Sequence, residues 1–245
     1  MKILRPFIFL AGLVLVVSLA CGGAVSNDEP TVAPQEPIVQ PDQPTPIPPT
    51  EAPVVSADPY FTEEFDSDPQ WHYEIIKGNE KSDIESVSYK FESSRMIFDI
   101  PEEALFAYYI YEGQTYEKVR LDIKVENRGV NSQQVSLICN FGDNAWYEWA
   151  VQSDGRWELF AVSDGYHRMH NGASNFIKQG KDVNEYAMIC VDNEISFFVN
   201  GEEPKGSPYI DRQYALRGGN VGFSISSLRA IPVLIEVDWF KISEP

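Results

Sequence analysis

Two carboxylates stand two residues apart near the end of this 245-residue chain, at Glu236 and Asp238. Side chains two apart on a β-strand lie on the same face of the sheet, so a strand here would place both acids together. Two carboxyl groups beside a glycosidic bond can act as nucleophile and as general acid or base. The alternative is a pair of solvated or hydrogen-bonded carboxylates. We favour that alternative and expect no catalytic residue.

Asp238 is also a candidate ligand for a structural calcium ion, together with Asp66 or Glu64. Calcium is a hard cation that binds clustered oxygen atoms, and carboxylates are its usual ligands in proteins. Solvated carboxylates without a metal are again the alternative. Calcium at Asp66 and Asp238 is the one cofactor that the sequence suggests.

His167 and His170 have His-x-x-His spacing and follow the turn dipeptide Asp164-Gly165. On a helix this spacing could bind a metal, but the turn residues predict a loop, and no third ligand is evident. We therefore expect loop histidines without a metal. No glycine-rich phosphate loop, nucleophile elbow or Ser/His/Asp arrangement stands out in the sequence.

Aromatic and polar side chains of the kinds that bind sugars are frequent between residues 108 and 168. Sugars present apolar C–H faces and hydroxyl edges, which suit aromatic rings flanked by carboxylate, amide or guanidinium groups. The alternative is that many of these rings fill the space between two sheets, and alternation places Trp146 and Glu148 opposite to Tyr147 and Trp149. The ligand-binding candidates are Tyr109, Tyr111, Trp146, Glu148, Trp157, Tyr166, His167 and Arg168, with Tyr108 as a further ring of the same type.

Cys139 and Cys190 each lie on the apolar side of a predicted strand. An exported domain with two such thiols favours a disulfide, provided that the Cα atoms come within about 7 Å. The alternative is two buried free thiols that act as small hydrophobic side chains. A bond would close a loop of about 50 residues.

The segment that must position all these residues runs from Tyr60 to Pro245 and alternates apolar and polar residues with period two. Val119, Leu121, Ile123 and Val125 point one way, and the residues between them are charged. The same alternation is seen at Val135, Leu137, Cys139 and Phe141, and at Ile195, Phe197 and Val199. Turn dipeptides separate such runs: Asp154-Gly155, Asp164-Gly165 and Asn200-Gly201. About a dozen strands and no helix of ten residues indicate an all-β fold of two packed antiparallel sheets.

Several stretches of this segment resemble the concanavalin A-like, or laminin-G-like, jelly-roll domains of bacterial surface lipoproteins. They include the opening Glu63-Glu-Phe-Asp66 with Trp71, Val135-Ser-Leu-Ile-Cys-Asn140, Trp146-Tyr-Glu-Trp149 before Ser153-Asp-Gly155, Tyr186-Ala-Met-Ile-Cys190, Ile195-Ser-Phe-Phe-Val-Asn-Gly201, Gly219-Asn-Val-Gly-Phe223 and the closing Ile235-Glu-Val-Asp-Trp-Phe240. The resemblance implies a two-sheet antiparallel jelly-roll sandwich. Asn140 is a departure, because relatives often have Arg after this Cys.

From the resemblance we expect non-catalytic carbohydrate recognition as the function. The same architecture also serves glycosidases and interaction modules, so the fold alone does not decide between these functions. Jelly-roll β-glucanases carry Glu-x-Asp-x-x-Glu on one strand in the middle of the domain. Here Lys241 takes the third position and the motif lies on the last strand. A glycoside hydrolase-like enzyme and a structural or protein-interaction module remain the alternatives.

The first 20 residues predict an export signal, because Lys2 and Arg5 precede an uncharged apolar run from Phe7 to Ala20. Fourteen helical residues rise only about 21 Å, too short for a membrane span. Ser18-Leu19-Ala20-Cys21 resembles the lipobox of bacterial lipoproteins, which implies lipidation of Cys21. The alternative is ordinary cleavage after Ala20, which would release a soluble protein.

Residues 21–59 predict a disordered linker, because they are rich in proline and contain no aromatic residue, Lys or Arg. Proline lacks the backbone N–H and favours extended polyproline II, so this segment is best explained as a spacer that holds residues 60–245 away from the membrane. A proline-rich ligand for a partner domain is the alternative.

The charge of the chain is strongly negative, at −18, from 19 basic and 37 acidic residues. A polyanion is electrostatically repelled by nucleic acid and by anionic lipid headgroups, so we expect no nucleic-acid partner and membrane contact only through the lipid. The expected location is extracytoplasmic, at the cell membrane or cell surface. Oligomeric state and the identity of the glycan stay open.

Overall fold

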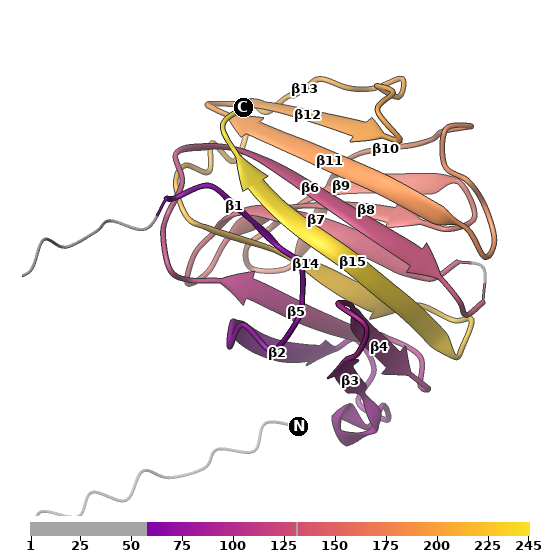
Figure 1. The fold of residues 1–245 in the computed structure, drawn as a ribbon. Coiled ribbons are helices and arrows are strands. Elements are labelled where there is room, and N and C mark those ends of the chain that lie inside the picture. The colour runs from indigo at the N-terminus through magenta and orange to yellow at the C-terminus, as the bar shows by residue number, and fades with distance from the viewer. Residues whose placement is uncertain (1–57, 131) are drawn as a thin grey trace, which may run out of the picture. The chain divides into compact units, whose positions relative to one another are not determined.

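The computed structural model describes residues 58–130 and 132–245, which form two antiparallel β-sheets packed face to face (Figure 1). The one helix of the described residues is a single 3-10 turn, η1 (Ile84–Ser86). None of the helices in these ranges is long and apolar enough to cross a membrane. The all-β sandwich expected from the sequence is confirmed. The predicted signal peptide 1–20, Cys21 and the 21–59 linker up to residue 57 lie outside the described residues.

One sheet, which we call the convex sheet, follows the order β13-β12-β11-β6-β15-β4-β3. The short strand β1 pairs with the C-terminal end of β15. Its strands are β1 (Phe61–Glu63), β3 (Ser88–Phe91), β4 (Met96–Ile100), β6 (Lys118–Asn127), β11 (Val183–Val191), β12 (Glu194–Val199), β13 (Tyr209–Ile210) and β15 (Val233–Ser243).

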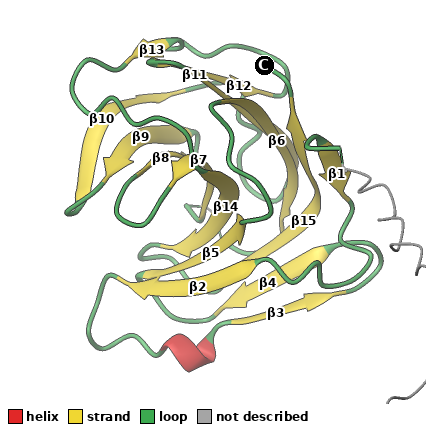
Figure 2. Cartoon of the chain, turned by 90° about the vertical axis from the view of Figure 1, so that its left-hand side faces the viewer, coloured by secondary structure: helices red, strands yellow, loops and turns green. Residues whose placement is uncertain are grey.

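The other sheet, which we call the concave sheet, follows the order β10-β9-β8-β7-β14-β5-β2. Figure 2 shows it curled into a C, with the convex sheet wrapped around its outside. Its strands are β2 (His72–Lys77), β5 (Leu105–Tyr111), β7 (Gln134–Phe141), β8 (Trp146–Gln152), β9 (Arg156–Val162), β10 (Tyr166–Ala173) and β14 (Asn220–Ser227). We call the hollow side, turned away from the convex sheet, the concave face.

Alternation along the strands builds the core between the sheets. Val119, Leu121, Ile123 and Val125 of β6 are all buried in it, as their spacing predicts. From the opposite sheet Trp149 stacks on Phe197, with ring centroids 5.0 Å apart. Each fully buried aliphatic or aromatic side chain of this size stabilises the fold by about 2 kcal/mol.

Phe141 departs from the alternation expected for β7. The register between β7 and β14 shifts at this end of the strand, and Asn140 takes a left-handed φ of 55°. Asparagine tolerates this conformation better than most residues. The bulge turns Phe141 out of the core and onto the concave face, where it packs with Trp146. The Asn140 amide donates to the carbonyl of Leu216, 3.1 Å away.

A disulfide joins Cys139 of β7 to Cys190 of β11, with the Cα atoms 6.7 Å apart. The bond therefore links the concave sheet to the convex sheet through the core, and both residues are buried. This is the pairing expected from the sequence.

Candidate functional site

Four of the eight ligand-binding candidates lie on the concave face: Trp146, Glu148, Tyr166 and Arg168. On β8, strand alternation places Trp146 and Glu148 there, because Tyr147 and Trp149 point into the core. On β10, Tyr166 and Arg168 pair with Val162 and Phe160, which lie on the same face. Arg168 donates to a carboxylate oxygen of Glu158 on the adjacent strand, at 2.9 Å.

The structure contradicts the ligand-binding role expected of Tyr109, Tyr111 and Trp157. Tyr109 and Trp157 are fully buried between the sheets, and Tyr111 packs against the same core. All three side chains point toward the convex sheet: the rings of Tyr109 and Trp157 are closed to a ligand, and the part-exposed ring of Tyr111 faces the core and not the concave face. Sequence alone could not tell which alternate residues of β5 point to the core and which to the concave face, because this strand is apolar on both sides.

The two histidines lie on strand β10 and not on the expected loop. His167 contacts Asp164 at 2.7 Å and packs beside the ring of Tyr214, and its parity turns it away from the concave face. His170 packs between Trp157 and Tyr209. The described residues contain no cluster of three or more His, Cys, Asp or Glu that could hold a metal.

Glu148 lies at the centre of the concave face and is fully buried. Its Oε2 accepts hydrogen bonds from the hydroxyl of Tyr108, at 2.9 Å, and from the indole N–H of Trp146, at 3.3 Å. Burial raises the pKa of Glu148, and the neighbouring hydroxyls of Ser136 and Tyr108 oppose that rise. The carboxyl group thus holds two aromatic side chains in fixed orientations.

Tyr166 bridges the hollow of the concave sheet. It begins β10, yet its hydroxyl hydrogen-bonds to that of Tyr108 on β5, although four strands separate β10 from β5 in the sheet. Its ring also lies 6.0 Å from Phe106 and 5.8 Å from Phe160, between centroids. Only strong curvature of the sheet allows such contacts. Tyr166 is 43% exposed and is the part of this cluster that solvent reaches most readily.

Phe106 and Phe160 also belong to this site, although neither is among the candidates predicted from the sequence. Together with Tyr108 and Ile138 they make the concave face apolar in its middle. A signal was present, because Leu105–Tyr111 is apolar on both faces, and a sheet with one solvated face would alternate.

The concave face has a cavity near each end of its strands. The first, of about 340 Å³, we call the acidic end; it is lined by His72, Glu74, Glu112 and Asp143 beside the ring of Trp146. Its histidine contacts the two glutamates at 3.8 and 4.0 Å. With three carboxylates and one imidazole in its lining, this end is negative and unsuited to anions.

The second cavity, of about 550 Å³, we call the arginine end; its lining includes Phe106, Gln152, Arg156 and Arg229. Tyr166 contacts Phe106, which lines this cavity, and Tyr108, which lines the other. The Tyr166 side chain therefore lies between the acidic end and the arginine end.

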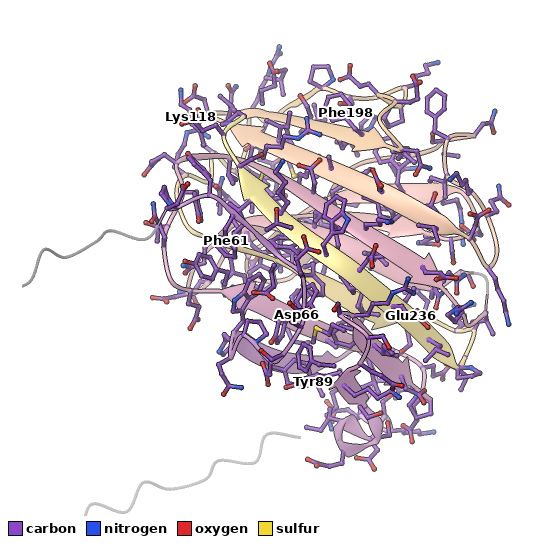
Figure 3. The ribbon with its side chains drawn as sticks, in the orientation of Figure 1. Phe61, Asp66, Tyr89, Lys118, Phe198 and Glu236 are labelled. Carbon is purple, nitrogen blue, oxygen red and sulfur yellow. A yellow bond between two sulfur atoms is a disulfide. The ribbon has the colours of Figure 1, made fainter. Side chains whose placement is uncertain are left out.

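The acids Glu236 and Asp238 lie on the convex sheet, away from this face; Figure 3 labels Glu236 on β15. Glu236 binds Arg95 and Arg128, and Asp238 binds Arg95 and Lys124. Burial acts to raise the pKa of Glu236, but hydrogen bonds from the two arginines outweigh it and hold the pKa below its usual range. These carboxylates are neutralised by cations.

The candidate calcium site at Asp66 and Asp238 is not formed by the described residues. Asp238 is occupied by two basic side chains, and Asp66 accepts a hydrogen bond from the hydroxyl of Ser94. A cation at Asp238 would have to displace Arg95 and Lys124, whose charges already satisfy the carboxylate.

No protein-family model matches the chain. No curated protein matches it either.

Solved structures with the same fold are numerous, and the three described next have 10 to 13% sequence identity. A Bacteroides ovatus mixed-linkage glucan GH16 protein, in complex with a G4G4G3G product, has a TM-score of 0.55 at 10% identity over 75% of this chain and 99% of that one. A Bacillus licheniformis β-glucanase has a TM-score of 0.52 at 13% identity over 78% and 100%. A Bacillus subtilis protein with a galectin-like fold has a TM-score of 0.52 at 11% identity over 75% and 94%. These likenesses establish the jelly-roll fold.

Proposed function

We propose that this chain is a non-catalytic glycan-binding module whose binding surface is the concave face. The observation that carries the proposal is the aromatic surface of that face, where the part-exposed rings of Trp146 and Tyr166 are held by hydrogen bonds to the buried Glu148 and to the buried Tyr108. Preformed aromatic surfaces with a few fixed polar groups suit sugar rings, because little side-chain entropy is lost on binding.

A glycoside hydrolase of the same fold is the second candidate, and the glucanase neighbours favour it. Such an enzyme needs two carboxyl groups about 5 to 10 Å apart on either side of the scissile bond. Glu148 is the only carboxylate on the strands β5, β7, β8 and β14 at the middle of the concave face. It is fully buried and bonded to Tyr108 and Trp146. We therefore place recognition ahead of hydrolysis.

Trp146→Ala is expected to weaken glycan binding by roughly thirtyfold, which corresponds to loss of an aromatic contact worth about 2 kcal/mol. A glycan array probed with the full chain selects the ligand, and isothermal titration calorimetry then compares the variants. Phe176→Ala is the matched control, because this ring is 42% exposed and lies outside both cavities.

Two results would contradict the proposal. One is equal binding by the protein and by Trp146→Ala; the other is release of reducing ends from a bound β-glucan that stops in Glu148→Gln. The second result would favour the hydrolase instead. Circular dichroism establishes that each variant is folded before binding is compared.

We further propose that the module is displayed outside the cytoplasm, anchored by lipid on Cys21. The basic and apolar start of the chain and the lipobox-like Ser18-Leu19-Ala20-Cys21 support this location. Cys21→Ser is expected to move most of the protein from the membrane fraction to the soluble fraction of the cells that export it. An unchanged membrane pool, measured by immunoblot, would refute lipid anchoring.

A further inference from the structure

The arginine end is a positive site on a strongly acidic domain. Residues 60–245 contain 31 acidic and 17 basic side chains, yet this cavity is lined by Arg156 and Arg229 and by no acid. The acidic end, across the Tyr166 bridge, has the opposite character. The concave face is therefore polarised along its strands.

The two arginines of this cavity differ in how their charge is used. Arg156 forms a two-pronged ion pair with Asp154, with nitrogen–oxygen distances of 2.6 and 3.0 Å. That pairing lowers the pKa of Asp154, so the aspartate stays ionised and cancels the charge of Arg156. Arg229 is exposed and makes no ion pair or side-chain hydrogen bond with the residues that the structure describes. The cavity thus has one uncompensated positive charge.

Gln152 gives this cavity an unused hydrogen-bond acceptor. It is only 5% exposed, it lines the cavity, and its Oε1 has no partner within the described ranges. A buried acceptor without a partner is costly, by more than a typical hydrogen bond gains, so a donor that enters the cavity and pairs with this atom would be stabilised. A hydroxyl group from a sugar is the complementary donor.

Phe106 supplies the apolar surface of the same cavity. Its ring packs against Tyr166 at the bridge, so the arginine end continues directly from the aromatic middle of the face. Arg229 and Gln152 line the same cavity as Phe106, so a ligand that extends from the middle of the face into this cavity meets both side chains. One unpaired cation, one acceptor and one ring match the carboxylate, the hydroxyl and the C–H face of a uronic acid.

We propose that the arginine end binds a uronic acid residue, so that the glycan recognised by the concave face carries a carboxylate at that end and uncharged sugars toward the acidic end. This inference rests on the proposed function and specifies its ligand. Arg229 would pair with the carboxylate, and Gln152 would accept a hydrogen bond from a sugar hydroxyl. A single uncompensated charge matches a monovalent carboxylate, and the acidic end would repel a glycan charged along its whole length.

The test compares two forms of one ligand by isothermal titration calorimetry with the full chain. The first is a glucuronoxylan oligosaccharide that carries one glucuronic acid, and the second is the same oligosaccharide after reduction of its carboxyl group to an alcohol. We expect the acidic form to bind about tenfold more tightly, as a charge-assisted hydrogen bond allows, and that preference to shrink as salt is added.

Arg229→Gln is expected to remove the preference for the acidic form and to leave binding of the reduced form within about twofold. Arg229→Lys keeps the charge and should retain part of the preference. Arg212→Gln is the matched control, because it removes the same charge from an exposed arginine that lines neither cavity.

The outcomes separate this inference from the function on which it rests. Equal binding of the two oligosaccharides, or an unchanged preference in Arg229→Gln, overturns the uronate assignment while glycan recognition stands. Failure of the acidic form to bind also overturns it, whatever neutral glycans bind. The proposed function itself fails on either of its own tests, namely glycan binding that does not depend on Trp146 or β-glucan hydrolysis that stops in Glu148→Gln.

Discussion

Replacement of both Cys139 and Cys190 by alanine is expected to lower the free energy of unfolding by about 2 to 4 kcal/mol. The disulfide closes a segment with a sequence separation of 51 residues, and removing it lets the unfolded chain explore many more conformations. The bond also ties β7 to β11 across the core, so it restrains the two sheets against each other.

Thermal denaturation of the full chain measures this effect. For a domain of this size the expected loss corresponds to a fall in Tm of roughly 5 to 15 °C. The protein treated with a thiol reductant should unfold at about the same temperature as the double variant, which controls for packing of the two alanines. An unchanged Tm in both samples would show that the bond contributes nothing to stability.

Asp211→Ala is expected to lower the free energy of unfolding by about 3 kcal/mol, because it breaks a buried polar cluster. Asp211 follows β13 and is only 2% exposed. Its carboxylate accepts hydrogen bonds from the hydroxyl of Tyr147 and from the backbone N–H groups of Gln213, Tyr214 and Ala215. The cluster fixes the loop after β13 to the start of β8, next to Trp146.

The contribution of Asp211 should depend on pH. Burial opposes ionisation, but the hydrogen bonds from Tyr147 and the backbone outweigh it and lower the pKa of Asp211. A carboxyl group with a lowered folded pKa stabilises the fold above its unfolded pKa, about 3.9, and loses that contribution as pH falls through the folded value. The difference between the protein and Asp211→Ala should therefore be full at pH 7 and shrink below about pH 4.

Urea denaturation at pH 7 and at pH 3 tests both the size and the sign of this effect. Asp99→Ala is the control, because Asp99 is an exposed residue on β4, and a change there should cost less than about 0.5 kcal/mol. A loss from Asp211→Ala that is equally small at pH 7, or that grows toward pH 3, would refute the role assigned to the carboxylate.

Side-chain alternation predicted the strands and much of the core, because burial of every second residue is a local property of an extended chain. Every second residue from Val119 to Val125 and from Ile195 to Val199 faces the interior, as the spacing predicts. Alternation failed at Phe141, where a bulge at Asn140 reverses the parity. Asn140 tolerates the left-handed φ at the bulge, but an asparagine alone does not predict the shift, which depends on pairing with β14.

The sequence by itself determined that this is an all-β sandwich, since that follows from residue types and a period of two. It favoured a bond between Cys139 and Cys190, but the Cα distance of 6.7 Å that permits the bond came from the tertiary structure. The sequence also supplied the kinds of side chain that a sugar would need. Only the tertiary structure decided which of them share a surface: it buried Tyr109 and Trp157 and brought Tyr166 to Tyr108. The physical reason is that the curl of the concave sheet accumulates over seven strands, so contacts across its hollow are set by the whole sheet and by no single segment.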